Sequence, residues 1–549
     1  MARHSHVMKL AALAAASALA LSACATKSGE SGSSEDGGDA KTTAGAVITI
    51  GTTDKVTSLD PAGAYDNGSF SVALQVYGFL FSAPYGESVM EPDLAESAEF
   101  TTPTEFEVKL KPDMKFANGN DLTASDVKFS FDRMVAINDP NGPASLLYNL
   151  ESTEVKDDTT VVFHLKEGND QVFKQILSSP AGPIVDEEVF DAEALTQPDA
   201  IVSGNAFAGQ YQIKQFDLNS LIQYELNPNY MGSHGEPANV GVRVKYYADS
   251  SNLKLDVQQG NIDVAYRSLS ATDIEDLKGN DDVKVETGPG GEIRYIVFNF
   301  DTQPFGAKQA DADPAKALAV RQAVADMLDR DALSEQVYKG TFTPLYSFVP
   351  AGLKASIEPL KDLYGDGSGG PDVAKAKQRL ADAGVSTPVE LKLQYSPDHY
   401  GPSSGDEYTA IKTQLETDGV FSVDLQSTEW VQYSKDRTAD VYPVYQLGWF
   451  PDYSDADNYL SPFFLKDNFL ANHYENQEVN DLILQQAVEV DDAKRVELLK
   501  EIQEKVAQDL STVPYLQGTQ VAVVGKDVTG IQLDASFKFP YAPIDKPND

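Results

Sequence analysis

The segment from Trp449 to Asp457 carries the side chains best suited to binding chemistry. It sets aromatic rings beside carboxylates: Trp449, Phe450, Tyr453, Asp452, Asp455 and Asp457. In a partly dehydrated cleft, a carboxylate paired with an ammonium group is stabilised more than in water, and an aromatic face adds cation–π attraction. The segment therefore favours a ligand that carries an amine. Two other interpretations stay open: a solvated acidic turn, and a calcium loop, although the spacing lacks the glycine and distal glutamate of an EF-hand.

A second motif could support nucleophilic catalysis. Gly401 to Gly405 matches GxSxG, with Ser403 at the nucleophile position, and it lies between a predicted strand and a helix predicted from Asp406. Several polar residues separate Tyr395 from Gly401, so the sequence favours a loop over a strained elbow. We expect no enzyme activity and keep a serine hydrolase as the alternative.

Other cofactor and metal motifs are weak. Gly365 to Gly370 contains GxGxxG, but no predicted strand precedes it and Asp366 would repel a pyrophosphate. Histidines after the N-terminal leader are widely separated and form no HExxH motif: His164, His234, His399 and His473. We therefore expect no cofactor and no bound metal.

The charge of the chain limits its partners. The formal net charge is −41. Nucleic acids and anionic lipids are bound by Lys and Arg side chains that neutralise phosphates, so an acidic chain is poorly suited to either. We expect no nucleic-acid partner. The charge either selects cationic ligands or only confers solubility.

The N-terminus predicts export and lipid attachment. An uncharged run from Leu10 to Leu21 follows Arg3 and Lys9; at about a dozen residues it is too short to cross roughly 30 Å of hydrocarbon. Leu21-Ser22-Ala23-Cys24 resembles the bacterial lipobox, in which the cysteine takes a diacylglycerol. We expect a signal peptide over residues 1–23, a lipidated Cys24, and a disordered linker that completes residues 24–46.

Strands and helices alternate from Val47 onward. Runs of β-branched and aromatic residues predict strands over Val47–Gly51, Phe106–Leu110, Val161–Leu165, Tyr211–Phe216, Leu221–Asn227, Val242–Tyr247, Arg294–Phe300, Glu390–Tyr395, Phe421–Thr428 and Gln520–Val524. Apolar spacing predicts helices over Ala315–Leu328, Pro371–Ala383, Glu478–Val488 and Asp492–Leu510, and Thr123 begins a capping box. This alternation is typical of an α/β protein, divided at a Gly-Pro-Gly-Gly break, Gly288–Gly291.

Several motifs together resemble one family. The run Lys115–Ser130 resembles KFxxGxxLTAxDVxFS, a signature of the solute-binding proteins of peptide and nickel ABC importers. Further matches follow in order: Ser58–Pro61 (LDP), Glu91–Ser97 (PxLAxS), Gln259–Val264 (QxGxxD), Val297–Asn299 with Val320–Ala323 (FN…VRQA), Asp372–Gly384, and Gly448–Asp452 with Ser461–Phe464. Phe207–Tyr211 departs from the family's GTGPY, keeping only its second glycine and its tyrosine. The chain resembles solute-binding protein family 5.

The resemblance implies a binding role for two segments. In peptide-binding relatives, the aspartate three residues after this tryptophan holds the peptide's free α-amino group; here that residue is Asp452. The backbone from Gln446 to Phe450, with Gly448 at its centre, and the segment Tyr65-Asp66-Asn67 correspond to strands that clasp an extended peptide. Main-chain pairing lets one site accept many peptide sequences.

One departure concerns the other end of the ligand. Dipeptide-binding relatives place an arginine after the strand that ends here at Tyr395, to hold the ligand's carboxylate. No arginine occurs between Gln394 and Gly401, and His399 is the candidate substitute. The resemblance therefore favours longer peptides as ligands.

The resemblance also implies a fold, a location and partners. It predicts a two-lobed periplasmic-binding-protein type II fold of the large peptide-binding class, with an extra subdomain in lobe one. The predicted divisions are residues 47–289 (lobe I), 290–517 (lobe II) and 518–549 (return to lobe I). We expect a monomer, lipid-anchored to the outer face of the bacterial cell membrane, that delivers oligopeptides to ABC permease subunits. Oligosaccharides or metal chelates, including nickel or haem, are the alternative ligands.

Overall fold

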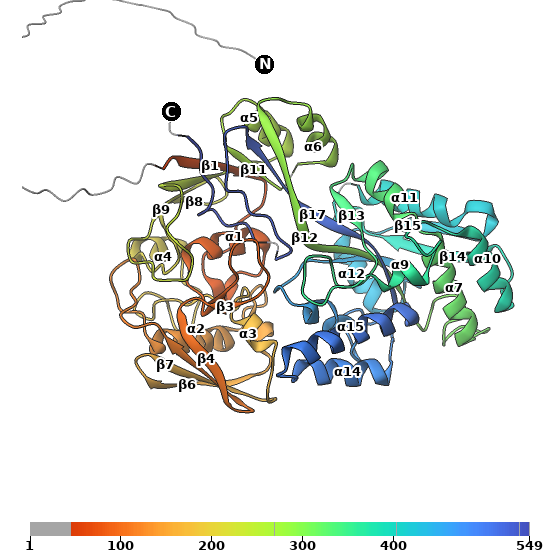
Figure 1. Cartoon of the computed structure of the whole chain (residues 1–549), viewed down its shortest axis with the longest axis horizontal. Helices are drawn as coiled ribbons and strands as arrows, with labels where there is room; N and C mark the ends of the chain where they lie inside the picture. The colour runs from red at the N-terminus through yellow and green to blue at the C-terminus, as the bar shows by residue number, and fades with distance from the viewer. Residues whose placement is uncertain (1–44, 268, 402, 537, 548–549) are drawn as a thin grey trace, which may run out of the picture. The chain divides into compact units, whose positions relative to one another are not determined.

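The computed structural model describes residues 45–267, 269–401, 403–536 and 538–547 (Figure 1). The predicted signal peptide, Cys24 and nearly all of the predicted linker lie outside these residues. Within the described part of the chain, no helix is both long and apolar enough to cross a membrane.

A large mixed sheet runs through the described residues. Its strand order is β15-β14-β16-β12-β17-β11-β1-β10-β9-β8, and β13 pairs with β17 outside this path. The strands are β1 (Val47–Thr52), β8 (Tyr211–Asp217), β9 (Leu221–Leu226), β10 (Gly241–Tyr246), β11 (Val264–Tyr266), β12 (Val283–Phe298), β13 (Phe342–Pro344), β14 (Val389–Tyr395), β15 (Phe421–Ser427), β16 (Val444–Trp449) and β17 (Thr512–Gly525). The alternation of strands and helices confirms the predicted α/β class.

The two longest strands, β12 and β17, join the two halves of this sheet. They pair antiparallel from Val283↔Gly525 to Val297↔Thr512 and run side by side in Figure 1. The predicted interruption of secondary structure at Gly288–Gly291 is wrong, because these residues lie inside β12, whereas the division of the chain there stays a prediction. The register shifts there, between Pro289 and Ile293. Glycine permits a close backbone approach, since a Cβ on Gly290 would lie 2.3 Å from the carbonyl oxygen of Gly518.

The remaining strands form two smaller sheets. One has the order β4-β5-β7-β6, and the other pairs β2 with β3. Their bounds are β2 (Phe81–Ser82), β3 (Glu91–Pro92), β4 (Ala95–Thr102), β5 (Glu105–Leu110), β6 (Leu150–Asp157) and β7 (Thr160–Leu165). Helix α2 (Ala124–Ile137) packs on the four-stranded sheet, and Thr123 begins it with the predicted capping box. This unit has its own apolar core, which includes Phe131 and Phe163.

Helices cover the sheets and connect the strands. They are α1 (Asn67–Val76), α3 (Phe173–Ile176), α4 (Pro198–Gly204), α5 (Ser250–Gln258), α6 (Ala271–Lys278), α7 (Pro314–Met327), α8 (Arg330–Ala332), α9 (Pro359–Leu363), α10 (Val373–Asp382), α11 (Ser404–Leu415), α12 (Trp430–Thr438), α13 (Ser461–Phe464), α14 (Gln477–Ala487) and α15 (Asp492–Asp509). The four helices predicted from apolar spacing are confirmed as α7, α10, α14 and α15.

The apolar cores divide the described chain into two lobes. On β12, Ile296 and Phe298 join one core, whereas Tyr295 and Val297 join another on the opposite face. These two cores define what we call the second lobe. Three other cores, around β1, β8 to β11 and the four-stranded sheet, define the first lobe. The predicted boundaries at 289/290 and 517/518 stay predictions, because β12 and β17 pass through both lobes.

Candidate ligand-binding site

The loop after β16 connects the two lobes. Asp452 accepts a hydrogen bond at Oδ1 from the phenol of Tyr65, which belongs to the segment before α1 in the first lobe. The next residue, Tyr453, is buried in the core of the four-stranded sheet. Two of the residues predicted to bind ligand, Tyr65 and Asp452, are therefore in direct contact, although they are 387 positions apart.

Asn458 holds this loop in shape. Its Oδ1 accepts from the backbone N–H of Asp452 at 3.0 Å and from the indole N–H of Trp449 at 3.0 Å. Its Nδ2 donates to Asp452 Oδ2 at 3.2 Å. Asn458 is 2% exposed, so it positions the carboxylate and the indole from the interior of the protein. Sequence reasoning missed this residue, and no motif distinguishes it from other loop asparagines.

Among the described residues, the carboxylate of Asp452 has neutral hydrogen-bond partners and no cation. Burial raises the pKa of Asp452 above its ordinary range, while the hydrogen bonds from Tyr65 and Asn458 act in the opposite direction. Among the ion pairs between described residues, none involves Asp452. Burial, followed by the charge of Asp452, also raises the pKa of Tyr65. A half-buried carboxylate without a counter-ion is suited to bind a cationic group.

Trp449 and Phe450 begin the same loop. The Trp449 ring meets Phe463 edge to face at a centroid distance of 5.0 Å, so one part of it packs on the second lobe's core. Phe450 is half-buried. Both side chains thus stand at the edge of the loop that carries Asp452, with Trp449 held by packing as well as by Asn458.

The other two aspartates of the segment have separate partners. Asp455 forms a bidentate ion pair with Arg495, with both N–O distances at 2.8 Å. Burial tends to raise the pKa of Asp455, but Arg495 outweighs it and holds that pKa below its ordinary value. Asp457 accepts hydrogen bonds from Ser461 and Gln486. The carboxylates therefore point to different partners rather than to one shared centre.

The two residues after Tyr65 differ in role. Asp66 is the N-cap of α1: it accepts from the backbone N–H of Ser69 at 2.8 Å and from the hydroxyl of Thr57. Asn67 is the exposed first residue of that helix. Asp66 therefore stabilises the turn that presents Tyr65, whereas the Asn67 side chain faces solvent.

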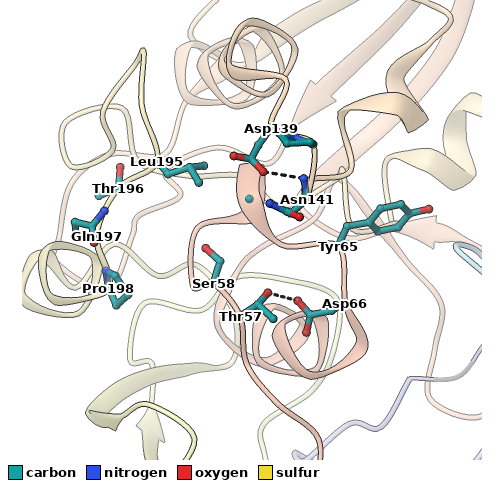
Figure 2. A pocket seen from close by; sticks show the side chains of 12 residues that line it. Thr57, Ser58, Tyr65, Asp66, Asp139, Asn141, Leu195, Thr196, Gln197 and Pro198 are labelled. Carbon is teal, nitrogen blue, oxygen red and sulfur yellow. Dashed lines mark hydrogen bonds between the residues drawn. The ribbon is translucent and has the colours of Figure 1, made fainter. Parts of the chain in front are cut away.

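A pocket of about 680 Å³ opens beside this turn (Figure 2). Tyr65 and Asp66 line one side, and the others are lined by Thr57, Ser58, Gly63, Asp139, Pro140, Asn141, Leu195, Thr196, Gln197 and Pro198. Its described lining includes two carboxylates and no Lys or Arg. Tyr65 thus borders this pocket and also reaches Asp452 in the other lobe.

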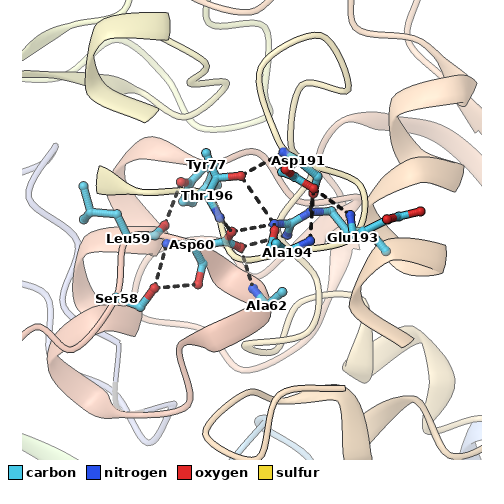
Figure 3. A network of polar contacts seen from close by, with 10 residues as sticks. Ser58, Leu59, Asp60, Ala62, Tyr77, Asp191, Glu193, Ala194 and Thr196 are labelled. Atoms are coloured by element: carbon cyan, nitrogen blue, oxygen red, sulfur yellow. Dashed lines mark hydrogen bonds and ion pairs between the residues drawn. The ribbon is translucent and has the colours of Figure 1, made fainter. Parts of the chain in front are cut away.

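A buried ion pair fixes the wall of the pocket (Figure 3). The guanidinium of Arg133, on α2, binds Asp60 through Nη1–Oδ1 at 2.8 Å and Nη2–Oδ2 at 2.6 Å. Asp60 also accepts from the backbone N–H groups of Ala62 and Thr196. The Ser58–Pro61 motif therefore joins α2 and the 191–196 loop to the chain that leads to Tyr65.

Tyr395 and His399, which were predicted to bind ligand, lie in an aromatic cluster at the end of β14. His399 stacks on Trp430 at a centroid distance of 3.6 Å, and burial, followed by the nearby charge of Arg294, lowers the pKa of His399 to about 4. His399 is therefore neutral at physiological pH. Tyr395 stacks on Tyr408. The 394–401 segment itself contains no arginine. An arginine from another element, Arg294 on β12, lies beside this segment, and sequence reasoning missed it.

Arg294 lies under Tyr400, beside Gly448. It is 3% exposed, pairs with Glu292 at 2.6 Å and donates from Nη2 to the Tyr400 carbonyl oxygen at 2.7 Å. Gly448 is its register partner on β16. Gln446 is fully buried, accepting from the Ser396 N–H at 3.0 Å and donating to Glu407 at 3.2 Å. The side chain of Gln446 therefore supports the site from inside the second lobe.

Neither the GxSxG nor the GxGxxG segment has the arrangement of a catalytic or phosphate-binding site among the described residues. Ser403 directly precedes α11, and no hydrogen bond between its hydroxyl and a histidine is found in the described chain. In the GxGxxG segment, Asp366 Oδ1 accepts from the backbone N–H groups of Ser368 and Gly370. An aspartate thus takes the amides that would otherwise hold a phosphate.

Comparison with known proteins identifies the family. Residues 89–470 match the family model for bacterial extracellular solute-binding proteins, family 5 (middle region). The chain belongs to this family. The predicted resemblance is therefore confirmed, and an extracytoplasmic solute-binding protein is the function that family membership supports.

Relatives match over nearly the whole chain. The probable D,D-dipeptide-binding periplasmic protein DdpA of Escherichia coli (strain K12) is 24% identical, covering 88% of this chain and 91% of its own. The glutathione-binding protein GsiB of the same strain is 26% identical, covering 91% and 94%. HbpA2 from Haemophilus parasuis has a TM-score of 0.77 at 20% identity, covering 91% and 99%. The predicted two-lobed periplasmic-binding-protein type II fold is thus confirmed.

Proposed function

We propose that this chain is the substrate-binding component of an ABC importer that captures oligopeptides between its lobes. The observation that carries the proposal is Asp452: a half-buried carboxylate with neutral partners, in a loop that contacts both lobes. A peptide's ammonium group would supply the missing counter-charge. Two relatives are named for peptide ligands, a D,D-dipeptide and glutathione, which also supports a peptide ligand.

The test compares peptides with and without a free amine. Calorimetry would measure the affinity of a tetrapeptide and of its N-acetylated form for the wild type, Asp452→Asn and Asp398→Asn. We expect the wild type to prefer the free amine by about tenfold or more, equivalent to about 1.4 kcal/mol. Asp452→Asn should abolish the preference, and Asp398→Asn, which changes an exposed carboxylate of the second lobe, should keep it. An unchanged preference in Asp452→Asn would exclude this role.

Ligand class is tested separately. A thermal-shift screen of peptides, oligosaccharides, nickel chelates and haem should show stabilisation by peptides, because a ligand that binds only the folded state raises its melting temperature. Stabilisation by oligosaccharides alone would replace the peptide proposal with a sugar-binding one. Turnover of generic esters, lost in Ser403→Ala, would instead support the hydrolase alternative.

We further propose that Cys24 anchors a monomeric protein to the outer face of the cell membrane. Cys24 follows a signal-like segment and is the sole cysteine of the chain. A tether from residue 25 to residue 46 would keep the binding lobes near the permease and raise their effective concentration there. Cys24→Ala should release the protein from membranes and reduce uptake, with peptide affinity in solution unchanged. Membrane retention of Cys24→Ala would contradict lipid anchoring.

A further inference from the structure

Three loops of the second lobe bring two carboxylates and an imidazole together. Asp301 follows β12, Asp440 follows α12, and His473 precedes α14. One ligand atom from each lies within 4.8 Å of the others. His473 Nε2 is 2.6 Å from Asp440 Oδ1 and 3.4 Å from Asp301 Oδ2. Their sequence separation is why a search for metal motifs passes over them.

Buried contacts hold the three loops in place. Asn299, which is fully buried, donates from Nδ2 to Asp440 Oδ1 at 2.8 Å and accepts at Oδ1 from the Asp301 N–H at 3.0 Å. The backbone N–H of Phe300 donates to the carbonyl oxygen of Asn472, beside His473, at 2.8 Å. Such second-layer hydrogen bonds orient ligand side chains at metal sites.

A cation already sits at this position. The ammonium of Lys308 is 2.8 Å from Asp301 Oδ2 and 3.5 Å from Asp440 Oδ2. The Lys308 side chain is 62% exposed, whereas that of Asp301 is 16% exposed. The carboxylates are thus held by the fold, while the lysine is free to move out into solvent. The net charge of −41 also raises the local concentration of cations.

The spacing fits one small ion. With bonds of about 2.0–2.2 Å, neighbouring ligand atoms of a tetrahedral zinc site lie roughly 3.3–3.5 Å apart. The two distances from His473 Nε2, 2.6 and 3.4 Å, require shifts of less than about 1 Å to match, and the two carboxylate oxygens lie within 4.8 Å of one another. A pocket of about 550 Å³ borders Asp440, and the His473 side chain is 42% exposed.

We propose that Asp301, Asp440 and His473 bind a divalent transition-metal ion, with Zn²⁺ the best match to this carboxylate and imidazole set. The ion replaces the Lys308 ammonium and keeps at least one position for water. It ties together the loops that begin and end the central strands of the second lobe. Asp440 precedes β16 and Asp452 follows it, so this site lies at the opposite end of that strand and does not rest on the proposed function.

The test uses metal ions alone, on protein made without a polyhistidine tag and treated with a chelator. Calorimetry and melting temperature would be measured with Zn²⁺, Ni²⁺ and Mn²⁺ for the wild type and three variants. We expect one saturable Zn²⁺ site per chain and a raised melting temperature. His473→Gln should weaken binding at least about tenfold, and Lys308→Ala should strengthen it at least about tenfold, because the competing cation is gone.

His164→Gln is the matched control. His164 also contacts two carboxylates, but through opposite ring nitrogens: Nε2 with Glu154 at 3.0 Å and Nδ1 with Glu105 at 3.9 Å. One ion cannot bridge such a set, so this variant should bind Zn²⁺ like the wild type.

Two outcomes would overturn the proposal. One is the absence of saturable binding to both the wild type and Lys308→Ala, which would mark the cluster as an ion-pair network alone. The other is binding that His473→Gln leaves intact. If His473→Gln fails to fold, Asp301→Asn provides the same test at a second ligand.

Discussion

The phenol of Tyr65 donates a hydrogen bond to Oδ1 of Asp452, and this bond joins the first lobe to the loop from Trp449 to Asp457 in the second, the proposed ligand loop. The donor is neutral and the acceptor is half-buried. A ligand ammonium would form a stronger, charge-assisted bond with the same carboxylate, so it would have to share or replace the Tyr65 hydroxyl. If Asp452 binds the ligand as proposed, ligand binding and contact between the lobes would be coupled at this one oxygen atom.

Tyr65→Phe tests this coupling. It removes one hydroxyl and leaves Asp452 with its bonds to Asn458 alone. We expect the protein without peptide to lose about 0.5–1.5 kcal/mol of stability, because a half-buried carboxylate loses a hydrogen bond. At saturating free-amine peptide, the difference in melting temperature from the wild type should shrink by at least about half, since the ammonium takes the hydroxyl's place.

Tyr247→Phe is the control for that experiment. Tyr247 donates to Asp256 at 2.6 Å, a bond of the same kind far along the chain from the ligand loop. Its loss should lower the melting temperature by the same amount with and without peptide. If Tyr65→Phe behaves in this way too, ligand and Tyr65 do not share Asp452.

The buried pair of Asp60 and Arg133 predicts a large effect on stability. Both side chains are almost fully buried. Asp60→Asn leaves the guanidinium without its counter-charge, which costs about 3–5 kcal/mol for a buried pair. Urea unfolding followed by circular dichroism measures the loss. Glu96→Gln, which breaks the exposed pair with Lys109, should change stability by less than about 1 kcal/mol. Equal effects of the two substitutions would contradict the structural role of Asp60.

Asp457 predicts a dependence of stability on pH. Burial, followed by the charge of Asp455, raises the pKa of Asp457 to about 6, above the unfolded value of about 3.9. As pH rises through this window, the unfolded chain loses its proton first, so Asp457 destabilises the fold progressively. Asp457→Asn should therefore gain stability relative to the wild type, by about 1–1.5 kcal/mol, between about pH 5 and about pH 7.5.

Asp455→Asn gives the comparison of opposite sign. Arg495 holds the pKa of Asp455 below its ordinary value, so the charged carboxylate stabilises the fold at neutral pH and this contribution is lost in acid. Its substitution should be more harmful at neutral pH than near about pH 2, because this contribution is lost only as the pH falls below the unfolded pKa of about 3.9. Urea unfolding at each pH measures both variants, and parallel pH profiles for the two would contradict the assignment.

Local patterns allowed much of the fold to be predicted. Alternating residues at Tyr211–Phe216 and apolar spacing at Asp492–Leu510 correspond to β8 and α15, because each pattern lies within one element. The pattern failed at β12. There, Gly288–Gly291 has the composition of a turn, and only pairing with β17, more than two hundred residues later, keeps it in a strand.

In the candidate site, too, residues within one short motif could be predicted, whereas contacts between distant segments could not. Trp449 and Asp452 were predicted together because they lie in one short motif. Tyr65 was predicted from a separate motif, but its hydrogen bond to Asp452 depends on how the lobes pack and is invisible in either segment. Arg294 was missed because a strand arginine is usually exposed. This one is covered by Tyr400, whose ring centroid lies 4.8 Å from Cζ of the arginine. Tertiary contacts, not residue types, distinguish these cases.

Gly448 gives the last prediction. A Cβ there would lie 2.8 Å from Cε1 of Tyr400 and 3.0 Å from the carbonyl oxygen of Ile293, so Gly448→Ala forces Tyr400 away from the strand. Overpacking of this kind costs about 1–3 kcal/mol. Because Tyr400 also covers Arg294 and contacts the Trp430 ring, the intrinsic fluorescence should shift as well. Gly235→Ala, where a Cβ meets nothing within 4 Å, should change neither quantity. A Gly448→Ala protein with wild-type stability and fluorescence would show that Tyr400 is not held against β16, and that the ligand loop has more room than these contacts allow.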